Sequence, residues 1–335
     1  MSTRPTVVMV THGDDNESVA LVAEAIRARG GVALRLDTDR FPMDVLVTVS
    51  EGDGAPEGAL STPEGSVALA DIAGIWWRRI AVAKTLPRDM ERQMRDACVE
   101  ESRRTLFGAL AASGAFTLDP MPAIRRAENK PQQLRVAREI GLDVPRTVST
   151  NDPAAVRALA AACPGGLIAK MMASFAIYDE AGRENVVFTN PVSEADLGDL
   201  DGLSLSPMTF QERVEKALEL RVTVVGEQVF AASIDSQRSA RAQNDWRRDG
   251  LAMIEDWNRY HLPDDVTAKL LRYMDRFGLN YGAADFIVTP DGRHVFLEVN
   301  PAGEWFWLQR APGLPIAEAL ADVLLGRAAR RGGAW

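Results

Sequence analysis

The first third of the chain alternates between short apolar runs and amphipathic segments. Residues 6–11 (TVVMVT) have the pattern of a buried strand, residues 18–29 repeat apolar positions at helical spacing, and residues 32–37 (VALRLD) predict a second strand. A strand, a helix and a strand in this order predict an α/β domain with parallel strands. Three further elements are expected before a domain boundary near Pro122: a strand over 74–79, a charged helix over 87–112 and a short strand over 116–120.

Beyond Pro122 the pattern changes to helices mixed with strands that are typical of hairpins. Helical spacing predicts helices over 130–140, 153–162, 264–277 and 316–325. Apolar runs bounded by turn residues predict strands over 166–172 and 210–214, and hairpins over 219–233 and 282–300. The expected fold is therefore α/β in its first part and of the α+β type after it.

The hairpin over 282–300 carries the most informative side chains. Its halves, GAADFIV and HVFLEVN, flank a Pro-Asp-Gly turn. If Thr289 and His294 close the turn, the count outward places Asp285 directly opposite Glu298.

Asn300 lies two residues beyond Glu298 and projects from the same face as the two carboxylates. Like charges that face each other destabilise a strand pair unless a cation compensates them. Hard oxygen ligands of this kind suit Mg²⁺, which commonly bridges protein carboxylates and substrate phosphates. The pattern predicts a magnesium site, and the alternative is a solvated polar face on an ordinary hairpin.

Composition narrows the class of protein. The 335 residues are 46% hydrophobic and 25% charged, as in globular proteins, and the net charge of −9 disfavours nucleic-acid binding. No apolar run can span a bilayer, and the N-terminus does not resemble a signal sequence. Cys98 and Cys163 lack metal-ligand spacing, so we expect free thiols in a reducing cytoplasm. The phosphate-binding loop G-x-G-x-x-G does not follow the first predicted strand, and G-x-x-x-x-G-K-[ST] occurs nowhere in the sequence.

Two lysines and a strand end are candidate contacts for a phosphorylated ligand. Lys170 lies in the apolar run LIAKMM, where a buried ammonium needs an anion, and Lys130 opens a helix, where the dipole also favours anions. Taken singly, each lysine is better explained as a surface lysine whose stem lies along apolar groups. The segment 211–214 is a candidate for binding a base or ribose, and the alternative is an exposed strand end. Glu219 and Arg221 share a strand face, so a structural ion pair is the alternative for both.

A segment rich in arginine lies between the two hairpins. Arg238, Arg241, Arg247 and Arg248 form a local positive patch in an acidic protein. Arginine binds carboxylates and phosphates through paired hydrogen bonds. The alternative is a solvated loop in which Asp235 is a partner of these arginines.

Taken together from Lys130 onwards, these features resemble the ATP-grasp superfamily, preceded by an α/β pre-ATP-grasp domain. The resemblance implies three domains, at 1–122, 123–210 and 211–335, with ATP and two Mg²⁺ ions as cofactors. Its implied phosphate contacts are Lys130 and Lys170, and its implied adenine and ribose contacts are Gln211, Glu212, Arg213, Val214 and Glu219. Its implied metal ligands are Asp285, Glu298 and Asn300.

Within this superfamily the chain resembles the graspetide synthetases, the microviridin-type macrocyclases. The resemblance rests on the runs at 215–237, 244–247 (NDWR) and 296–309 (FLEVNPAGEWFWLQ), and on DTDRFP (37–42) and GIWWRR (74–79) near the N-terminus. It implies that an Asp or Glu side chain of a ribosomally made precursor peptide is phosphorylated by ATP. A Thr or Ser hydroxyl or a Lys amine of the same peptide then attacks, which gives an ω-ester or ω-amide.

The resemblance also suggests roles for further residues. Arg221, Arg238 and Arg247 are expected near the acyl phosphate or the substrate carboxylate. Asp235 is a candidate general base, although a structural ion pair explains it equally well. Residues 173–185 are a candidate closing loop that excludes water. The precursor's leader segment is the expected partner, and a homodimer is compatible with the sequence.

Two other functions compete with this one. Another ATP-grasp carboxylate–amine ligase, such as one that adds glutamate to a ribosomal protein, shares the phosphoryl chemistry and differs only in the acceptor. A non-catalytic peptide-binding module would instead be expected to lose its phosphate and metal positions. Those positions are intact, which favours an enzyme.

Overall fold

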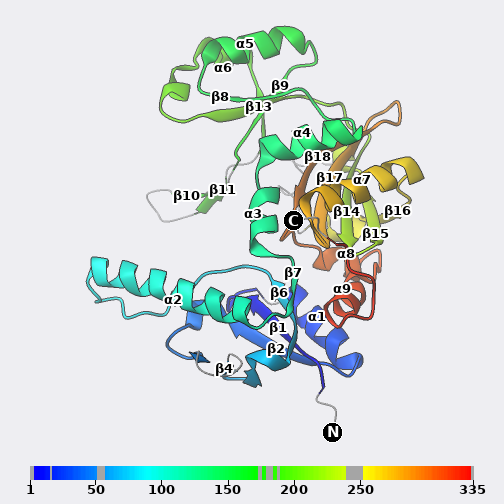
Figure 1. Ribbon diagram of the computed structural model, residues 1–335. Helices are drawn as coiled ribbons and strands as arrows, with labels where there is room; N and C mark the ends of the chain where they lie inside the picture. The colour runs from blue at the N-terminus through cyan, green and yellow to red at the C-terminus, as the bar shows by residue number, and fades with distance from the viewer. Residues whose placement is uncertain are drawn as a thin grey trace.

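The structure is a computed structural model that describes residues 4–15, 17–50, 57–172, 176–178, 184–186, 189–238 and 252–332. An N-terminal α/β unit, a smaller central unit and a C-terminal unit follow one another along the chain (Figure 1). In this described part of the protein, no helix is both long and apolar enough to cross a membrane.

The N-terminal unit is built on a parallel sheet in the order β2-β1-β6-β7. Its strands are β1 (Thr6–Thr11), β2 (Val32–Asp37), β6 (Ile72–Trp77) and β7 (Phe116–Leu118). Helix α1 (Glu17–Ala28), between the parallel strands β1 and β2, confirms the predicted βαβ start. Helix α2 (Arg92–Ala112) was predicted separately and begins five residues later than its pattern suggested. The Glu91 carboxylate accepts a hydrogen bond from the Met94 N–H at 3.0 Å and caps the helix there. A small antiparallel sheet of β3 (Leu46–Ser50), β4 (Glu57–Thr62) and β5 (Gly65–Ala68) was not anticipated.

The central unit holds a second sheet, in the order β12-β9-β13-β8, whose neighbours are all antiparallel. Its strands are β8 (Thr147–Thr150), β9 (Leu167–Lys170), β12 (Asn190–Val192) and β13 (Met208–Glu212), and its helices are α5 (Pro153–Ala162) and α6 (Glu194–Gly198). The short strands β10 (Ala176–Tyr178) and β11 (Glu184–Val186) pair separately. The helices α3 (Met121–Ala127) and α4 (Lys130–Ile140) lead into this unit from the N-terminal sheet (Figure 1).

The C-terminal unit contains a five-stranded antiparallel sheet in the order β16-β15-β14-β17-β18. Its elements are β14 (Leu218–Val225), β15 (Gln228–Ile234), β16 (Asn258–Tyr260), α7 (Asp264–Phe277), β17 (Tyr281–Val288) and β18 (His294–Asn300). Alternate residues of the strands, such as Val222 and Phe286, pack with α4 and α7 on one face. The intervening residues, such as Arg221 and Asp285, therefore project from the other face.

The pairing of β17 with β18 combines a correct and an incorrect prediction. The structure pairs Asp285 with Glu298, as predicted, and Asn300 with Ala283. The turn, however, closes one residue earlier, because His294 pairs with Val288. A bulge beside Asp285 absorbs the difference, since Asp285 opposes Glu298 while Phe286 opposes Phe296.

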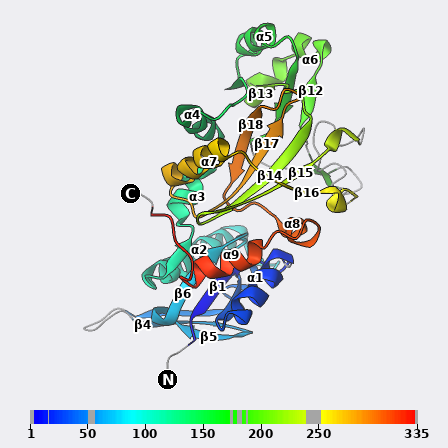
Figure 2. The ribbon, with the colours of Figure 1, turned by 90° about the vertical axis from the view of Figure 1, so that its right-hand side faces the viewer.

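The chain ends by returning to the N-terminal unit. After α8 (Phe306–Arg310), helix α9 (Ile316–Leu324) lies against α1 (Figure 2). Asp322 accepts two hydrogen bonds from Arg29, at 2.5 and 3.0 Å. The helix itself was predicted, but its packing on the opposite end of the chain was not.

A buried carboxylate also joins the N-terminal and C-terminal units. Asp119, directly after β7, is 2% exposed and accepts hydrogen bonds from the N–H groups of Asn280 and Tyr281, each at 2.8 Å. Burial raises the pKa of Asp119 from 3.8 to about 7, against the lowering effect of these two donors. The folded protein therefore holds a proton on Asp119 at pH values where the unfolded chain has lost it.

Substituting Asp119 by asparagine is expected to change how stability depends on pH. Between about pH 4 and 7 the folded state binds more protons at this site, so the contribution of Asp119 to wild-type stability falls as pH rises, by up to about 1.4 kcal/mol per pH unit. The difference in the free energy of unfolding between wild type and Asp119→Asn, measured from pH 4.5 to 7.5 by denaturant titration, should shrink or reverse with rising pH. A constant difference across this range would contradict the assigned pKa.

Candidate functional site

A cleft of about 1250 Å³ is lined by residues of the central sheet and of the C-terminal sheet, on the face of the latter opposite to α4 and α7. It is lined by every residue that the sequence predicted for ATP or metal binding: Lys130, Lys170, Gln211, Glu212, Arg213, Val214, Glu219, Asp285, Glu298 and Asn300. Arg221 lines it as well. These positions span more than half of the chain in sequence, and the fold gathers them at one place.

At the edge formed by β17 and β18, each carboxylate is held by a basic side chain. The Lys130 ammonium lies 3.0 Å from the Glu298 carboxylate, and the Arg221 guanidinium lies 2.9 and 3.1 Å from the two oxygens of Asp285. The sequence predicted that a cation compensates the facing carboxylates of Asp285 and Glu298. Two basic side chains of the protein supply part of this positive charge. Lys130 is the first residue of α4, so this ion pair also connects α4 to the hairpin of β17 and β18.

The donor set on this face fits Mg²⁺. Asp285, Glu298 and Asn300 offer two carboxylates and one amide oxygen, and the described residues contain no cluster of three His, Cys, Asp or Glu side chains that would favour another metal. The amide oxygen of Asn300 also accepts a hydrogen bond from the Ala302 N–H at 3.0 Å, which orients it and leaves a second lone pair. A site with so few protein ligands is typical of Mg²⁺ shared with phosphate oxygens.

Arg221 is the central cation of the cleft. It is buried, with one guanidinium nitrogen on Asp285 and the other 2.8 Å from the Glu304 carbonyl oxygen. Although burial alone would lower the pKa of Arg221, the charge of Asp285 keeps that pKa above its ordinary value. The guanidinium also lies 5.8 Å from the centre of the Trp307 ring. Of the alternatives open for Arg221, the structure shows an ion pair with Asp285 rather than with Glu219.

Gly303 allows the loop after β18 to approach Arg221 closely. A Cβ atom at this position would lie 2.7 Å from the Arg221 guanidinium and 2.6 Å from the Ala283 side chain. Both distances are shorter than side chains tolerate. The glycine of the GEWFW run is therefore required by packing around the site.

The segment 211–214 passes from the central sheet to the C-terminal sheet and forms the wall predicted for adenine and ribose. The N–H of Glu212 donates to the Arg146 carbonyl at 2.8 Å, and the N–H of Arg213 donates to the Gly166 carbonyl at 3.0 Å. The Gln211 amide donates to the Thr147 hydroxyl at 2.8 Å. The side chain of Gln211 is thus held against the central unit by one of its two amide N–H groups, and its carbonyl oxygen and second N–H are not used in this bond.

Glu219 has partners that the sequence analysis did not identify. Its carboxylate lies 2.8 Å from the Lys216 ammonium and accepts a hydrogen bond from the Ser236 hydroxyl at 2.6 Å. Lys216 also lines the cleft. Its position three residues before Glu219 was the feature of the sequence from which this ion pair could have been predicted. Lys170, expected to be buried, is half-buried at the end of β9.

The remaining predicted residues fall elsewhere. Asp235 accepts a hydrogen bond from the Gln237 N–H at 3.1 Å and caps a turn after β15, and neither it nor the exposed Arg238 is among the described residues that line the cleft. Arg247 lies outside the described residues, as does most of the candidate closing loop over 173–185. Their proposed roles stay predictions.

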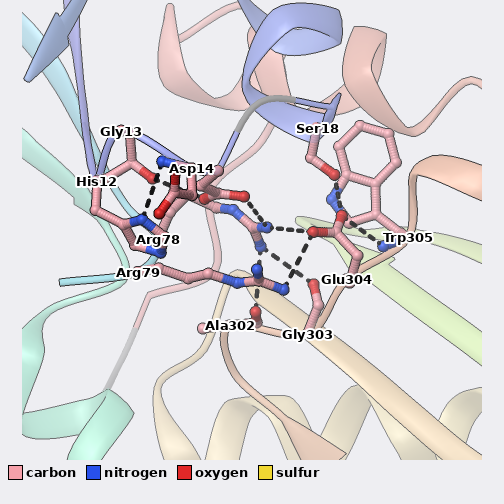
Figure 3. A network of polar contacts seen from close by, with 12 residues as sticks. His12, Gly13, Asp14, Ser18, Arg78, Arg79, Ala302, Gly303, Glu304 and Trp305 are labelled. Carbon is pink, nitrogen blue, oxygen red and sulfur yellow. Dashed lines mark hydrogen bonds and ion pairs between the residues drawn. The ribbon is translucent and has the colours of Figure 1, made fainter. Parts of the chain in front are cut away.

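The N-terminal unit reaches the cleft through a polar network at the end of β6 (Figure 3). The side chain of Arg78 is fully buried and donates to the carbonyl oxygens of Ala302 and Gly303, at 3.1 and 3.3 Å. It also lies 2.8 Å from the Glu304 carboxylate and 3.4 Å from Asp15. Sequence reasoning missed this network, and its signal was a pair of arginines directly after a buried strand.

The two tryptophans after Glu304 are core residues. Trp305 is fully buried and Trp307 nearly so, in a cluster with α1 and α9. Trp307 additionally forms part of the cleft wall. The run therefore packs the C-terminal unit onto the N-terminal unit and shapes the cleft at the same time.

A cleft between two sheets, lined by two lysines, by the segment that connects the sheets and by a hairpin with two carboxylates, is the arrangement of an ATP-grasp ligase. The family model described as the MvdD pre-ATP grasp domain matches residues 6–125. A curated relative, a probable alpha-L-glutamate ligase of Shewanella loihica, is 24% identical over 214 residues, which are 63% of this chain and 67% of the relative.

Two solved structures resemble the whole chain. The macrocyclase MdnC of Microcystis aeruginosa, bound with precursor peptide MdnA, is 43% identical with a TM-score of 0.86, over 96% of this chain and 99% of the other. A Chryseobacterium gregarium ATP-grasp ligase associated with ribosomally synthesised and modified peptides, in complex with ADP and a leader and core peptide, is 37% identical with a TM-score of 0.93, over 98% and 99%. The chain belongs to this family of peptide-modifying ATP-grasp macrocyclases, the graspetide synthetases.

Proposed function

We propose that this protein is an ATP-dependent macrocyclase that forms ω-ester or ω-amide crosslinks between side chains of a ribosomally made precursor peptide. One observation carries the proposal: the cleft retains the complete set of predicted ATP and metal residues in a chain that is similar over nearly its whole length to peptide-bound macrocyclases. A third relative, PsnB, 26% identical, is described as complexed with a minimal precursor, Mg and ADP. We therefore assign ATP and Mg²⁺ as its cofactors.

Different cleft residues would bind different parts of ATP and the metal ion. Lys130 and Lys170 hold the phosphates, the segment 211–214 contacts adenine, and Glu219 is placed for the ribose. Asp285, Glu298 and Asn300 hold Mg²⁺, which supplies charge neutralisation at the transferring phosphoryl group. Because the Lys130 ammonium lies 3.0 Å from the Glu298 carboxylate, it is positioned beside the residues that would hold the metal.

The reaction has two steps. A side-chain carboxylate of the peptide attacks the terminal phosphorus of ATP, so that an acyl phosphate forms and ADP leaves. A hydroxyl or amine of the same peptide then attacks the acyl carbon, and inorganic phosphate leaves. The proton of the attacking group passes to solvent or to a base. Arg221, buried beside Asp285, is placed to stabilise charge at the phosphoryl group.

The product distinguishes this function from that of a carboxylate–amine ligase. The purified protein would be incubated with ATP, Mg²⁺ and either MdnA or short acidic peptides encoded in the flanking DNA. Macrocyclisation removes the mass of one water for each bond, whereas ligation adds the mass of a residue. Mass spectrometry should show water loss together with release of ADP. A peptide that gains residue masses would favour the ligase that the Shewanella relative represents.

Lys170→Ala is expected to raise the KM for ATP by about 10- to 100-fold, because a charge-assisted phosphate contact is lost. Initial rates of ADP release, measured against ATP at saturating peptide, test this expectation. Lys269→Ala serves as a matched control, because Lys269 lies on α7 in an exposed pair with Asp265 and does not line the cleft. An unchanged KM for ATP in Lys170→Ala would remove Lys170 from the phosphate site.

We also place the enzyme in the cytoplasm. Both cysteines are free thiols, Cys163 buried and Cys98 half-buried, which fits a reducing compartment. ATP and a freshly translated precursor peptide are available together there.

A further inference from the structure

Arg79 is an arginine of the N-terminal unit that lines the cleft of the other two units. It follows Arg78 directly after β6, and its side chain is 50% exposed, whereas that of Arg78 is fully buried. The strand therefore ends by directing one guanidinium into the interior and the next into the cleft. Among the described residues, the ionic contact of Arg79 is with the Glu304 carboxylate, at 3.5 Å.

The Glu304 carboxylate does not depend on Arg79. One of its oxygens accepts hydrogen bonds from the Ser18 hydroxyl and from the Trp305 N–H, the latter at 3.0 Å, and the other lies 2.8 Å from Arg78. Because a long, half-exposed ion pair contributes little to stability, Arg79 can exchange Glu304 for another anion at small cost.

The other described basic residues near the metal edge have closer partners. Lys130 is bound to Glu298 at 3.0 Å, Lys216 to Glu219 at 2.8 Å and Arg221 to Asp285 at 2.9 Å. Arg221 and Arg79 meet on the same residue, since Arg221 binds the backbone oxygen of Glu304 and Arg79 its carboxylate. Two guanidiniums from different units therefore contact the same residue of the cleft wall, Glu304, and one of them, Arg221, also binds Asp285.

We propose that Arg79 binds the ω-carboxylate of the peptide's Asp or Glu side chain and presents it to the phosphoryl group. The proposal rests on the proposed function, because it names the residue that recognises the acidic substrate of that reaction. A guanidinium binds a carboxylate through two parallel hydrogen bonds, which fixes the orientation of the attacking oxygen. Arg79 belongs to the N-terminal unit, so this unit takes part directly in selecting an acidic side chain.

The test uses glutarate, which carries the same ω-carboxylate as a glutamate side chain. Isothermal titration calorimetry of the full-length protein with ADP and Mg²⁺ should show glutarate binding that weakens about 10- to 100-fold in Arg79→Ala and less in Arg79→Lys. Arg92→Ala is the matched control, because Arg92 lies at the start of α2 with a side chain that is 92% exposed. Affinity for glutarate that stays within twofold of wild type in Arg79→Ala, or no glutarate binding by wild type, would overturn the proposal.

Peptide kinetics give a second readout. With MdnA as the probe, Arg79→Ala should raise the KM for peptide and leave the KM for ATP unchanged, which a purely structural change would not do. Cyclisation by wild type with an unaltered peptide KM in Arg79→Ala defeats the role of Arg79 and leaves the proposed function standing. Glutarate binding that depends on Arg79, in a protein that cyclises no peptide, supports the anion site and counts against the proposed function.

Discussion

Asp285→Asn is expected to lower the rate of peptide-dependent ADP release by at least about 100-fold. Asparagine keeps the shape of the side chain and one hydrogen bond to Arg221 but removes the charge that Mg²⁺ requires. Raising the Mg²⁺ concentration should recover only part of the loss. The measurement is the initial rate of ADP release across a Mg²⁺ titration, with the thermal transition recorded for each variant.

The choice of asparagine over alanine follows from the packing of Arg221. Because Arg221 is buried, Asp285→Ala would leave its charge without the carboxylate partner and destabilise the fold by about 3 kcal/mol. Asp291→Asn is the matched control, since Asp291 lies in the turn of the same hairpin, is exposed and does not line the main cleft. Wild-type turnover by Asp285→Asn would refute the metal assignment.

Arg78→Ala is expected to destabilise the protein by about 3–5 kcal/mol and to impair catalysis. Its guanidinium is the described cation that contacts both Asp15 and Glu304 at the junction of the N-terminal and C-terminal units. Removing it leaves these carboxylates poorly compensated and frees the carbonyls of Ala302 and Gly303. Since the next carbonyl, that of Glu304, holds Arg221, the loss should spread to the metal edge.

Denaturant midpoints and rates of ADP release test both parts of this prediction. Arg104→Ala is the matched control, because Arg104 forms an exposed pair with Glu100 on α2 in the same unit. Glu304→Gln should have a milder effect, as its amide oxygen can still accept a hydrogen bond from Arg78. If Arg78→Ala matches wild type in both measurements, the network of Figure 3 does not support the cleft.

The hairpin of β17 and β18 shows which features can be predicted from local sequence and which cannot. Alternation of side chains and the Pro-Asp-Gly turn correctly predicted that Asp285 faces Glu298. The same count gave the wrong turn closure, because nothing in HVFLEVN marks the bulge beside Asp285. A bulge inserts one residue into one strand, so its presence depends on how the two strands pack rather than on residue types alone.

The contacts between units were beyond the same reasoning. Gly74 and Gly303 were simply glycines in sequence, yet a Cβ on Gly74 would lie 2.7 Å from the Leu324 carbonyl of α9. The docking of α9 on α1 and the insertion of Glu304 between Arg78 and Ser18 join residues more than 200 positions apart. Apolar periodicity identifies which face of an element is buried but not which distant element covers it.

The sequence by itself determined many of the elements, the set of residues predicted for ATP and metal binding, and the family, because these depend on local spacing and on motifs in a fixed order. Tertiary structure alone decided which cation holds each carboxylate: Lys130 for Glu298, Arg221 for Asp285 and Arg78 for Glu304. It also placed Arg79 in a cleft made by other units. Ion pairing falls off within a few ångströms, so it follows the distances that packing sets and not the separation along the chain.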